Sequence, residues 1–242
     1  MSWREKALEH WYYSQPEWVS GSDDYRKWVS NNARTQGICL EIGPGPGGKT
    51  SRYLAEHFEC VEGLDIDPSI IKNESLSKTF IYDGRKFPME DERYDCIVSD
   101  YVAEHVEYPS ILFHEVNRVL KPGGRFFFRT PNLWHYVSLA SKLSPYRFHL
   151  FISHRLRNMD LDSHDVYPTF YRMNTRRCLC CLAQEAGLDV IELRMIEKEP
   201  SYGLISPLLF YPFMLYERIV NSSRIFEGVR ANIFGMLEKR CC

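Results

Sequence analysis

The sequence predicts an α/β fold, with a mostly parallel sheet and helices on both of its faces. Short apolar runs that suit buried strands alternate along the chain with longer segments of helical periodicity. The first of these runs ends in a glycine-rich turn, and the second ends in an acidic residue about 20 positions further on. Strands that alternate with helices in this way favour parallel pairing through right-handed crossovers.

Up to residue 130 the elements follow in a regular order. Residues 3–34 place polar and aromatic side chains at helical spacing and predict N-terminal helices. The segment KPGG at 121–124 stops a helix and opens the fifth strand. The expected elements are the strand 37–42, the helix 49–58, the strand 60–67, the helix 68–76 opened by Pro68, the strands 78–83 and 94–100, the helix 109–120 and the strand 125–130.

After residue 130 the alternation is interrupted. Residues 131–173 mix helical stretches with turn signals and predict an inserted lid over the ligand edge of the sheet. The remaining expected elements are the helix 175–187 stopped by Gly187, the strand 189–196, an inserted helix at 206–220 interrupted near Pro212, and a last strand at 231–238.

The size of the chain favours a single domain. A chain of 242 residues, of which 44% are apolar and 14% aromatic, can bury one good core. The expected parts of this domain, 1–242, are N-terminal helices that also suit a lid at 1–36, a ligand-binding core at 37–130, the substrate-cover insertion at 131–173, and the C-terminal part of the sheet at 174–242 with an inserted helix at 206–221.

Net charge and cysteine content limit the classes of partner and the cellular compartment that we expect. A net charge of −2 supplies no broad positive field, so no nucleic-acid partner is expected. The N-terminal residues lack a secretory signal, and no stretch is apolar enough to span a bilayer, which leaves at most peripheral membrane contact. Eight cysteines in such a chain favour reduced thiols and a cytoplasmic protein. The run CLCC at 178–181 lacks a second pair at zinc spacing, so no metal site is expected.

The glycine turn GPGPGGKT at 43–50 matches three ligand-binding patterns at once. It fits the phosphate loop G-x-x-x-x-G-K-[ST], the dinucleotide pattern G-x-G-x-x-G, and the G-x-G-x-G pattern of methyl-donor binding. A phosphate loop works because consecutive backbone N–H groups point at the phosphates. Pro44 and Pro46 have no N–H, which weakens both phosphate-binding interpretations, although Asp100 suits a magnesium ligand and Asp65 suits a ribose-binding acid.

Glu41, directly before the turn, favours the third pattern. Its negative charge repels a pyrophosphate but suits S-adenosylmethionine, which has no phosphate and carries a sulfonium cation. The two phosphate-binding interpretations stay open as alternatives.

Four segments then resemble, in order, the motifs of class I S-adenosylmethionine-dependent methyltransferases. The resemblance covers about residues 37–195 and is greatest to the small-molecule, type 11 group that includes ubiquinone and menaquinone biosynthesis enzymes. The four segments are LEIGPGPGG, GLDIDP, the stretch YDGRKFPMEDERYDCIVSDYVAEHV, and EVNRVLKPGGRFFFRTP. The resemblance implies a Rossmann-like, seven-stranded sheet whose last strand runs antiparallel, with S-adenosylmethionine as the cofactor. Pro46 departs from the alanine or serine of many relatives.

The resemblance also implies the cofactor-binding residues. They are Glu41, Gly43, Pro44, Gly45, Gly47, Asp65, Ile66, Asp83, Gly84, Asp100 and Tyr101. Asp65 is expected to hold the ribose and Asp83 with Gly84 the purine edge. Each acid has a structural alternative, because Asp65 also suits a helix cap and Asp83 an Asx turn.

Three residues are candidates for the catalytic side. His105 follows the fourth strand and His135 the fifth, and a side chain that titrates near neutrality can accept a proton from the methyl acceptor. Tyr171 is expected to face the pocket if the insertion folds down as a cover. Packing alone also accounts for both histidines.

The predicted function is in-line methyl transfer from S-adenosylmethionine to a small-molecule acceptor, aromatic or lipid-linked, bound beneath 131–173. Much of the acceleration in such a reaction comes from alignment and exclusion of water, so a general base is optional. The alternatives are an RNA or protein methyltransferase and a cofactor-binding protein without turnover.

Overall fold

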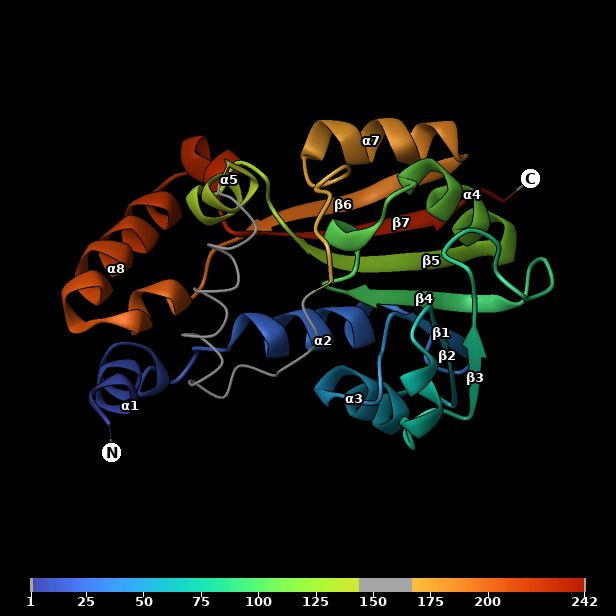
Figure 1. The fold of residues 1–242 in the computed structure, drawn as a ribbon, viewed down its shortest axis with the longest axis horizontal. Coiled ribbons are helices and arrows are strands. Elements are labelled where there is room, and N and C mark those ends of the chain that lie inside the picture. The colour runs from blue at the N-terminus through green and yellow to red at the C-terminus, as the bar shows by residue number, and fades with distance from the viewer. Residues whose placement is uncertain (1, 144–166, 242) are drawn as a thin grey trace. The chain divides into compact units, whose positions relative to one another are not determined.

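The computed structural model describes residues 2–143 and 167–241 (Figure 1). The chain divides into two compact units. We call them the helical unit, which comprises Met1–Asp24, Asn132–Pro168 and Met195–Asn232, and the sheet unit, which comprises Tyr25–Pro131, Thr169–Arg194 and Ile233–Cys242.

The sheet unit is built on seven strands in the order β3-β2-β1-β4-β5-β7-β6. Their bounds are β1 Ile38–Ile42, β2 Cys60–Asp65, β3 Lys78–Ile81, β4 Tyr94–Asp100, β5 Leu120–Pro131, β6 Leu188–Ile196 and β7 Asn232–Lys239. Strands β1 to β5 pair in parallel, and β7 runs opposite to β4 (Figure 1). The predicted Rossmann-like, mostly parallel seven-stranded sheet is therefore confirmed.

The strand order reverses between β1 and β4, since the chain moves outward to β3 and then returns to the other side of β1. Ile42 pairs with both Leu64 of β2 and Ser99 of β4, so these three strands end at one edge. In open α/β sheets, ligands bind at such a reversal, outside the carboxyl ends of the strands.

Helices cover both faces of the sheet, and β5 shows which helix covers which face. Successive side chains of a strand point to opposite faces. Phe127 packs on Trp28 of α2, with ring centroids 5.5 Å apart, whereas Phe126 packs on Phe113 of α4 at 6.1 Å. The helices of this unit are α2 Gly21–Asn32, which begins in the helical unit, α3 Lys49–His57 beside it, α4 Pro109–Val119, α7 Arg176–Glu185, and the short turns η2 Pro68–Lys72 and η3 Ala103–His105.

One predicted helix is shorter than expected. The segment 68–76 forms only the single 3₁₀ turn η2, which ends at Lys72. Asn73 leaves helical geometry because its side chain donates to the Ser51 hydroxyl at 3.1 Å and lies 3.5 Å from the Gly45 carbonyl oxygen. The chain is therefore tied to the glycine turn instead of continuing as a helix.

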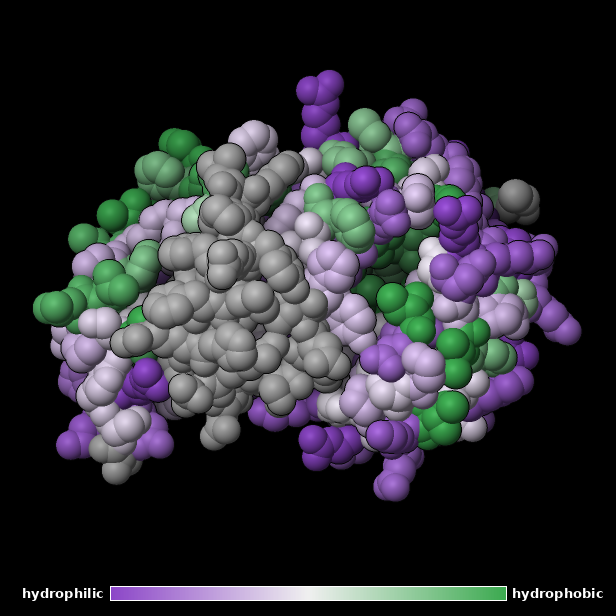
Figure 2. All heavy atoms as spheres, viewed as in Figure 1, coloured by the Kyte–Doolittle hydropathy of each residue, from purple (hydrophilic) through white to green (hydrophobic). Residues whose placement is uncertain are grey.

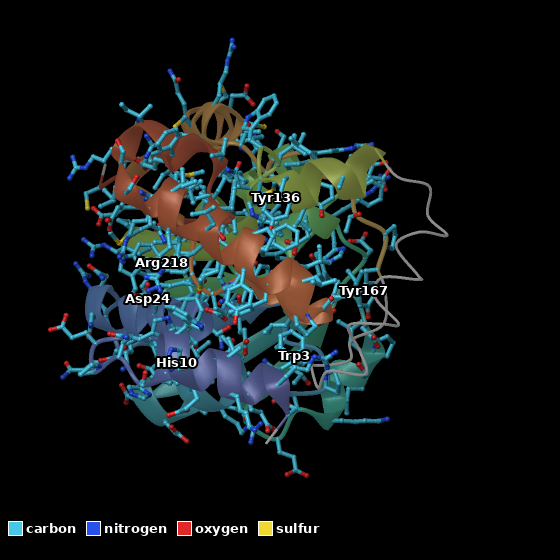
Figure 3. The ribbon with its side chains drawn as sticks, turned by 90° about the vertical axis from the view of Figure 1, so that its left-hand side faces the viewer. Trp3, His10, Asp24, Tyr136, Tyr167 and Arg218 are labelled. Atoms are coloured by element: carbon cyan, nitrogen blue, oxygen red, sulfur yellow. The ribbon has the colours of Figure 1, made fainter. Side chains whose placement is uncertain are left out.

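In the part that the structure describes, the helical unit consists of short segments around the longer helix α8. They are α1 Trp3–Leu8, the π-helical η1 Glu9–Tyr13, α5 Tyr136–Leu143, η4 Ser201–Ile205, α8 Pro207–Ser222 and η5 Arg224–Val229. Phe210 of α8 packs edge-on against Trp3, and Phe213 stacks on Tyr136 with centroids 5.0 Å apart. Figure 3 labels Trp3 on α1, Tyr136 on α5 and Arg218 on α8.

The predicted interruption near Pro212 was wrong, because α8 runs through this residue. Pro212 is exposed, so water can bond the Leu208 carbonyl that loses its helical N–H donor. Of the predicted insertion 131–173, residues 144–166 lie outside the described part, and so does the lid proposed there. No helix among the described residues combines the length and the apolar character needed to cross a bilayer.

Candidate functional site

The glycine turn after β1 is held by its own backbone. Gly43, Gly45 and Gly47 all have positive φ, at 72°, 58° and 120°. A Cβ atom on Gly43 would collide with Val102, so both conformation and space require glycine there. The Gly43 N–H donates to the Leu64 carbonyl at 2.8 Å, which fixes the turn beside the end of β2.

Asp65 ends β2 and faces the same turn. One of its carboxylate oxygens accepts from the Gly45 N–H at 2.8 Å, and the other accepts from the Asp67 N–H at 2.9 Å. Each oxygen can still accept a further donor such as a hydroxyl group. The predicted ribose role of Asp65 is compatible with this position and stays a prediction.

These contacts leave the first half of the turn without amides for a phosphate. The N–H groups of Gly43 and Gly45 are used within the protein, and Pro44 and Pro46 have none. The cradle of N–H groups that a phosphate loop needs is therefore not formed between residues 43 and 46.

Glu41 lies at the end of β1, beneath the turn, with only 3% of its surface exposed. Burial raises the pKa of Glu41 to about 8; the carboxylates of Asp100 and Asp65 act in the same direction, and Ser51 opposes them with a hydrogen bond. Its Oε2 atom finds no hydrogen-bond partner in the described parts of the chain. A buried carboxyl oxygen beside two further acids is suited to a cationic group.

Asp100, at the end of β4, is neutralised by an arginine on the neighbouring strand. Arg129 of β5 donates from Nε at 2.6 Å and from Nη2 at 2.8 Å, and the Thr50 hydroxyl also donates to Asp100, at 2.8 Å. The guanidinium lies over the rings of Tyr25 and Tyr101, at 5.1 and 4.3 Å from their centroids. The sequence analysis missed Arg129 and Thr50, although the register of β4 and β5 places residues 100 and 129 opposite one another.

Tyr101 follows Asp100 in a left-handed conformation, with φ of 58°. Such backbone geometry is uncommon outside glycine and concentrates at ligand-binding positions. Its side chain is 39% exposed at the ligand edge of the sheet, where the sequence predicted a cofactor contact.

The predicted adenine contacts also lie together. A Cβ atom on Gly84 would be 3.8 Å from Ile66, whose side chain is half exposed after β2. Asp83 forms the Asx turn that was its structural alternative, since its Oδ1 accepts from the N–H groups of Arg85 and Lys86. These two hydrogen bonds lower the pKa of Asp83. The purine roles of Ile66, Asp83 and Gly84 stay predictions.

The structure brings His105 and Tyr171 together through Glu104, the residue directly before His105. The Glu104 carbonyl accepts from the N–H groups of Phe170 and Tyr171, at 2.8 and 3.2 Å. Tyr171, like Tyr101, has positive φ, at 50°. The two candidate catalytic residues of the sheet unit are thus neighbours, although they are far apart in sequence.

Glu104 itself is a buried acid that the sequence analysis did not single out. Its carboxylate accepts from the Thr130 hydroxyl at 3.2 Å, and that hydroxyl accepts from Asn174 at 2.6 Å. Burial raises the pKa of Glu104 to about 7. Its apolar neighbours Ala103 and Val102 gave no signal of such a site, because the partners come from β5 and from the segment before α7.

His135 belongs to the helical unit. It is 4% exposed, and its Nε2 atom lies 3.6 Å from Glu197 Oε2, beyond hydrogen-bonding distance. Burial lowers the pKa of His135 to about 4 and raises that of Glu197 to about 8, so both are uncharged near neutrality. Tyr136 and Tyr216 pack against the imidazole. The base role of His135 stays a prediction.

The helical unit also contains a pocket of about 340 Å³. Its lining includes Trp11, Tyr12, Trp18, Glu197, Glu217 and Arg218. The Tyr12 hydroxyl donates to the buried Glu217 carboxylate at 3.0 Å, and Arg218 lies over the Tyr12 ring. Aromatic walls with a few fixed polar groups are typical of small-molecule pockets.

A family model described as methyltransferase domain matches residues 6–193, more than half of the chain. A ubiquinone biosynthesis O-methyltransferase of Coxiella burnetii is 32% identical over 101 residues, which cover 38% of this chain and 43% of that protein. The chain spans about half the length of the curated relatives it matches.

Solved structures share the fold at low identity. A methyltransferase in complex with the Trm112 activator of Haloferax volcanii superimposes with a TM-score of 0.59 at 18% identity, covering 98% of this chain and 94% of that chain. Geranyl diphosphate C-methyltransferase of Streptomyces coelicolor, solved with Mg²⁺, geranyl diphosphate and S-adenosyl-L-homocysteine, gives 0.54 at 14% identity, covering 88% of this chain and 76% of that chain.

Proposed function

The chain belongs to the methyltransferase-domain family, and from this premise we propose that it transfers a methyl group from S-adenosylmethionine to a small-molecule acceptor. The observation that carries the proposal is the buried Oε2 atom of Glu41, which has no hydrogen-bond partner among the described residues. It lies beneath a glycine turn whose residues 43–46 have no amide to spare for a phosphate. S-adenosylmethionine, when bound, supplies an electrophilic methyl group on a positively charged sulfur.

The residues around the turn fit this cofactor. Glu41 and Asp65 provide negative charge and hydrogen-bond acceptors at the ends of β1 and β2. The half-exposed Ile66 offers apolar contact beside Gly84. Asp100 is held by Arg129 and Thr50, so its role is to fix the end of β4 and the position of Tyr101.

Proton removal from the acceptor, where its chemistry requires it, is assigned to the cluster after β4. His105 and Tyr171 adjoin Glu104, whose pKa of about 7 allows it to exchange a proton near neutrality. Tyr171 and Tyr101 are both held in left-handed conformations at this place. Water exclusion and alignment by these side chains contribute the rest of the rate.

The acceptor is proposed to be a small molecule with an aromatic or lipid-linked group. The similarity to a ubiquinone biosynthesis O-methyltransferase supports this choice. The net charge of −2 does not favour an RNA acceptor.

Calorimetry tests the cofactor, with S-adenosylmethionine, S-adenosylhomocysteine, ATP and NAD titrated in turn. We expect saturable binding of the first two only. Saturable ATP or NAD binding, with no heat from the adenosyl ligands, would contradict the proposal.

Methyl transfer is tested separately, with the protein, a labelled methyl donor and a cell extract, followed by mass spectrometry of the labelled product. His105→Ala and Tyr171→Phe should lower turnover more than cofactor affinity. Tight cofactor binding without any labelled product would favour a cofactor-binding protein that has no turnover.

A further inference from the structure

The pocket of the helical unit combines aromatic rings with charged side chains. Its volume of about 340 Å³ is within the range of small-molecule sites, which begins at about 300 Å³. The rings in its lining are those of Trp11, Tyr12 and Trp18. Most exposed side chains of α8 are apolar, as Figure 2 shows, but the three residues that α8 contributes to the pocket are polar. The lining therefore suits a small ligand that has both apolar groups and a charge.

The two cationic side chains among the described lining residues already have acidic partners. Arg218 Nε lies 3.4 Å from a carboxylate oxygen of Glu217, and Lys198 Nζ lies 3.1 Å from a carboxylate oxygen of Asp24. The guanidinium of Arg218 also lies over the ring of Tyr12, 5.5 Å from its centroid. These pairs leave no unbalanced positive charge in the described lining, so an anionic ligand is not favoured.

Glu197 is the lining acid that has no cationic partner among the described residues. Its side chain is 6% exposed, and its Oε2 atom accepts from the Ala231 N–H at 2.8 Å. The same oxygen lies 3.6 Å from Nε2 of His135, whose imidazole is uncharged near neutrality. Arg230 favours the charged form of Glu197 through space, but its guanidinium donates to backbone carbonyl groups instead.

Glu197 is mostly protonated when the pocket holds no cation. Burial raises its pKa to about 8, and the nearby acids Glu217 and Glu199 act in the same direction. A cation in the pocket would favour the charged carboxylate and take the place of the proton. Binding of a cation should therefore release protons from the protein.

We propose that this pocket binds an organic ammonium ion with alkyl substituents. Glu197 supplies the opposite charge, while the aromatic rings attract the cation through their faces and cover its alkyl groups. A metal ion is not favoured, because the described residues contain no group of three potential metal ligands. The inference is independent of the methyl-transfer reaction.

Calorimetry tests the proposal with choline and with 3,3-dimethyl-1-butanol, an uncharged molecule of the same shape. We expect saturable binding of choline, and binding of the alcohol that is weaker by at least about tenfold. Choline binding should release protons at pH 7. Its affinity should rise by up to about tenfold between pH 7 and pH 9, because Glu197 ionises over this range.

Glu197→Gln should weaken choline binding by at least about tenfold at pH 9, remove the proton release, and leave the affinity for the alcohol unchanged. Glu9→Gln is the matched control, because Glu9 is an exposed acid of the same unit outside the described lining, and it should leave choline binding unchanged.

The aromatic contribution has its own pair of variants. Trp18→Leu should weaken choline binding by about fivefold, because leucine keeps apolar contact but has no aromatic face. Trp134→Leu should not, since this exposed tryptophan lies outside the described lining. Thermal melts of all variants report whether they remain folded.

Three results would overturn the proposal: no saturable binding of choline, equal affinity for choline and the alcohol, or choline binding that Glu197→Gln leaves unchanged. Benzoate is titrated in the same way to examine the opposite charge. Tighter binding of benzoate than of choline would assign the pocket to anionic ligands and reject the ammonium ion.

Discussion

Glu41 makes cofactor affinity depend on pH in a defined direction. Burial raises its pKa to about 8, so about one-tenth of the free protein carries a charged Glu41 at pH 7. A cationic ligand beside this carboxyl favours its charged form. Binding at pH 7 should therefore release nearly one proton, and affinity should rise about tenfold, or about 1.4 kcal/mol, between pH 7 and pH 9.

The assay is isothermal titration of S-adenosylmethionine between pH 6.5 and pH 9, in buffers of different ionisation heat that reveal the proton release. Glu41→Gln should bind with a flat pH profile, about tenfold more weakly than wild type at pH 7 and about a hundredfold more weakly at pH 9. Glu56→Gln serves as the control, because Glu56 is an exposed acid on the nearby helix α3.

The free energy of unfolding of the ligand-free protein should change in the opposite direction and fall as the pH rises. The folded pKa of Glu41 lies above the unfolded value of 4.5, so its contribution is fully present below pH 4.5 and is lost as pH rises through about 8. The loss amounts to about 3 kcal/mol at pH 7, and Glu41→Gln should abolish it. A wild-type affinity that is flat from pH 7 to pH 9, or a slope that survives in Glu41→Gln, would refute this account of the site.

Three further predictions concern the structure around the site and the helical unit. Arg129→Gln leaves Asp100 without its bidentate partner and should lower the free energy of unfolding in urea by about 3 to 5 kcal/mol. Adding Asp100→Asn should partly restore it, and additive effects of the two substitutions would show that the pair is not coupled. Gly43→Ala places a Cβ atom at a positive φ of 72° and against Val102, so it should destabilise the fold by about 2 kcal/mol and weaken cofactor binding. Wild-type stability together with wild-type cofactor affinity would disprove the tight turn. The folded pKa of His135 is about 4 and lies below the unfolded value of 6.5, so its contribution to stability is present above pH 6.5. About 3 kcal/mol of that contribution is lost as the pH falls through 4. The stability difference between wild type and His135→Gln should change over this pH range, and a constant difference would exclude a buried, neutral His135.

The family and the fold were both readable from the sequence. The resemblance of residues 37–195 to class I methyltransferases is confirmed by the family match at 6–193. The strand 94–100 and the helix at 109–120 were placed within a residue of β4 and α4. The helix at 68–76 was overestimated because the side chain of Asn73 bonds to residues more than 20 positions away.

The chemistry of the candidate site was only partly readable. The glycine turn and Asp65 were recognised from their spacing, and they meet in the structure. Arg129 and Glu104 were missed, because each acquires its role from a partner on another element: Arg129 from Asp100 on β4, and Glu104 from Thr130 on β5.

The sequence by itself determined the order of strands and helices and the position of the glycine turn. Apolar periodicity, prolines and glycines act on neighbouring residues, so they can be interpreted without the fold. The tertiary structure alone decided the charge of each acid at the site. Asp100 is paired with Arg129, whereas Glu41 is buried, has an oxygen that no described residue contacts through a hydrogen bond, and has a pKa of about 8. Burial and ion pairing depend on residues brought together from distant parts of the chain, so local patterns cannot supply them.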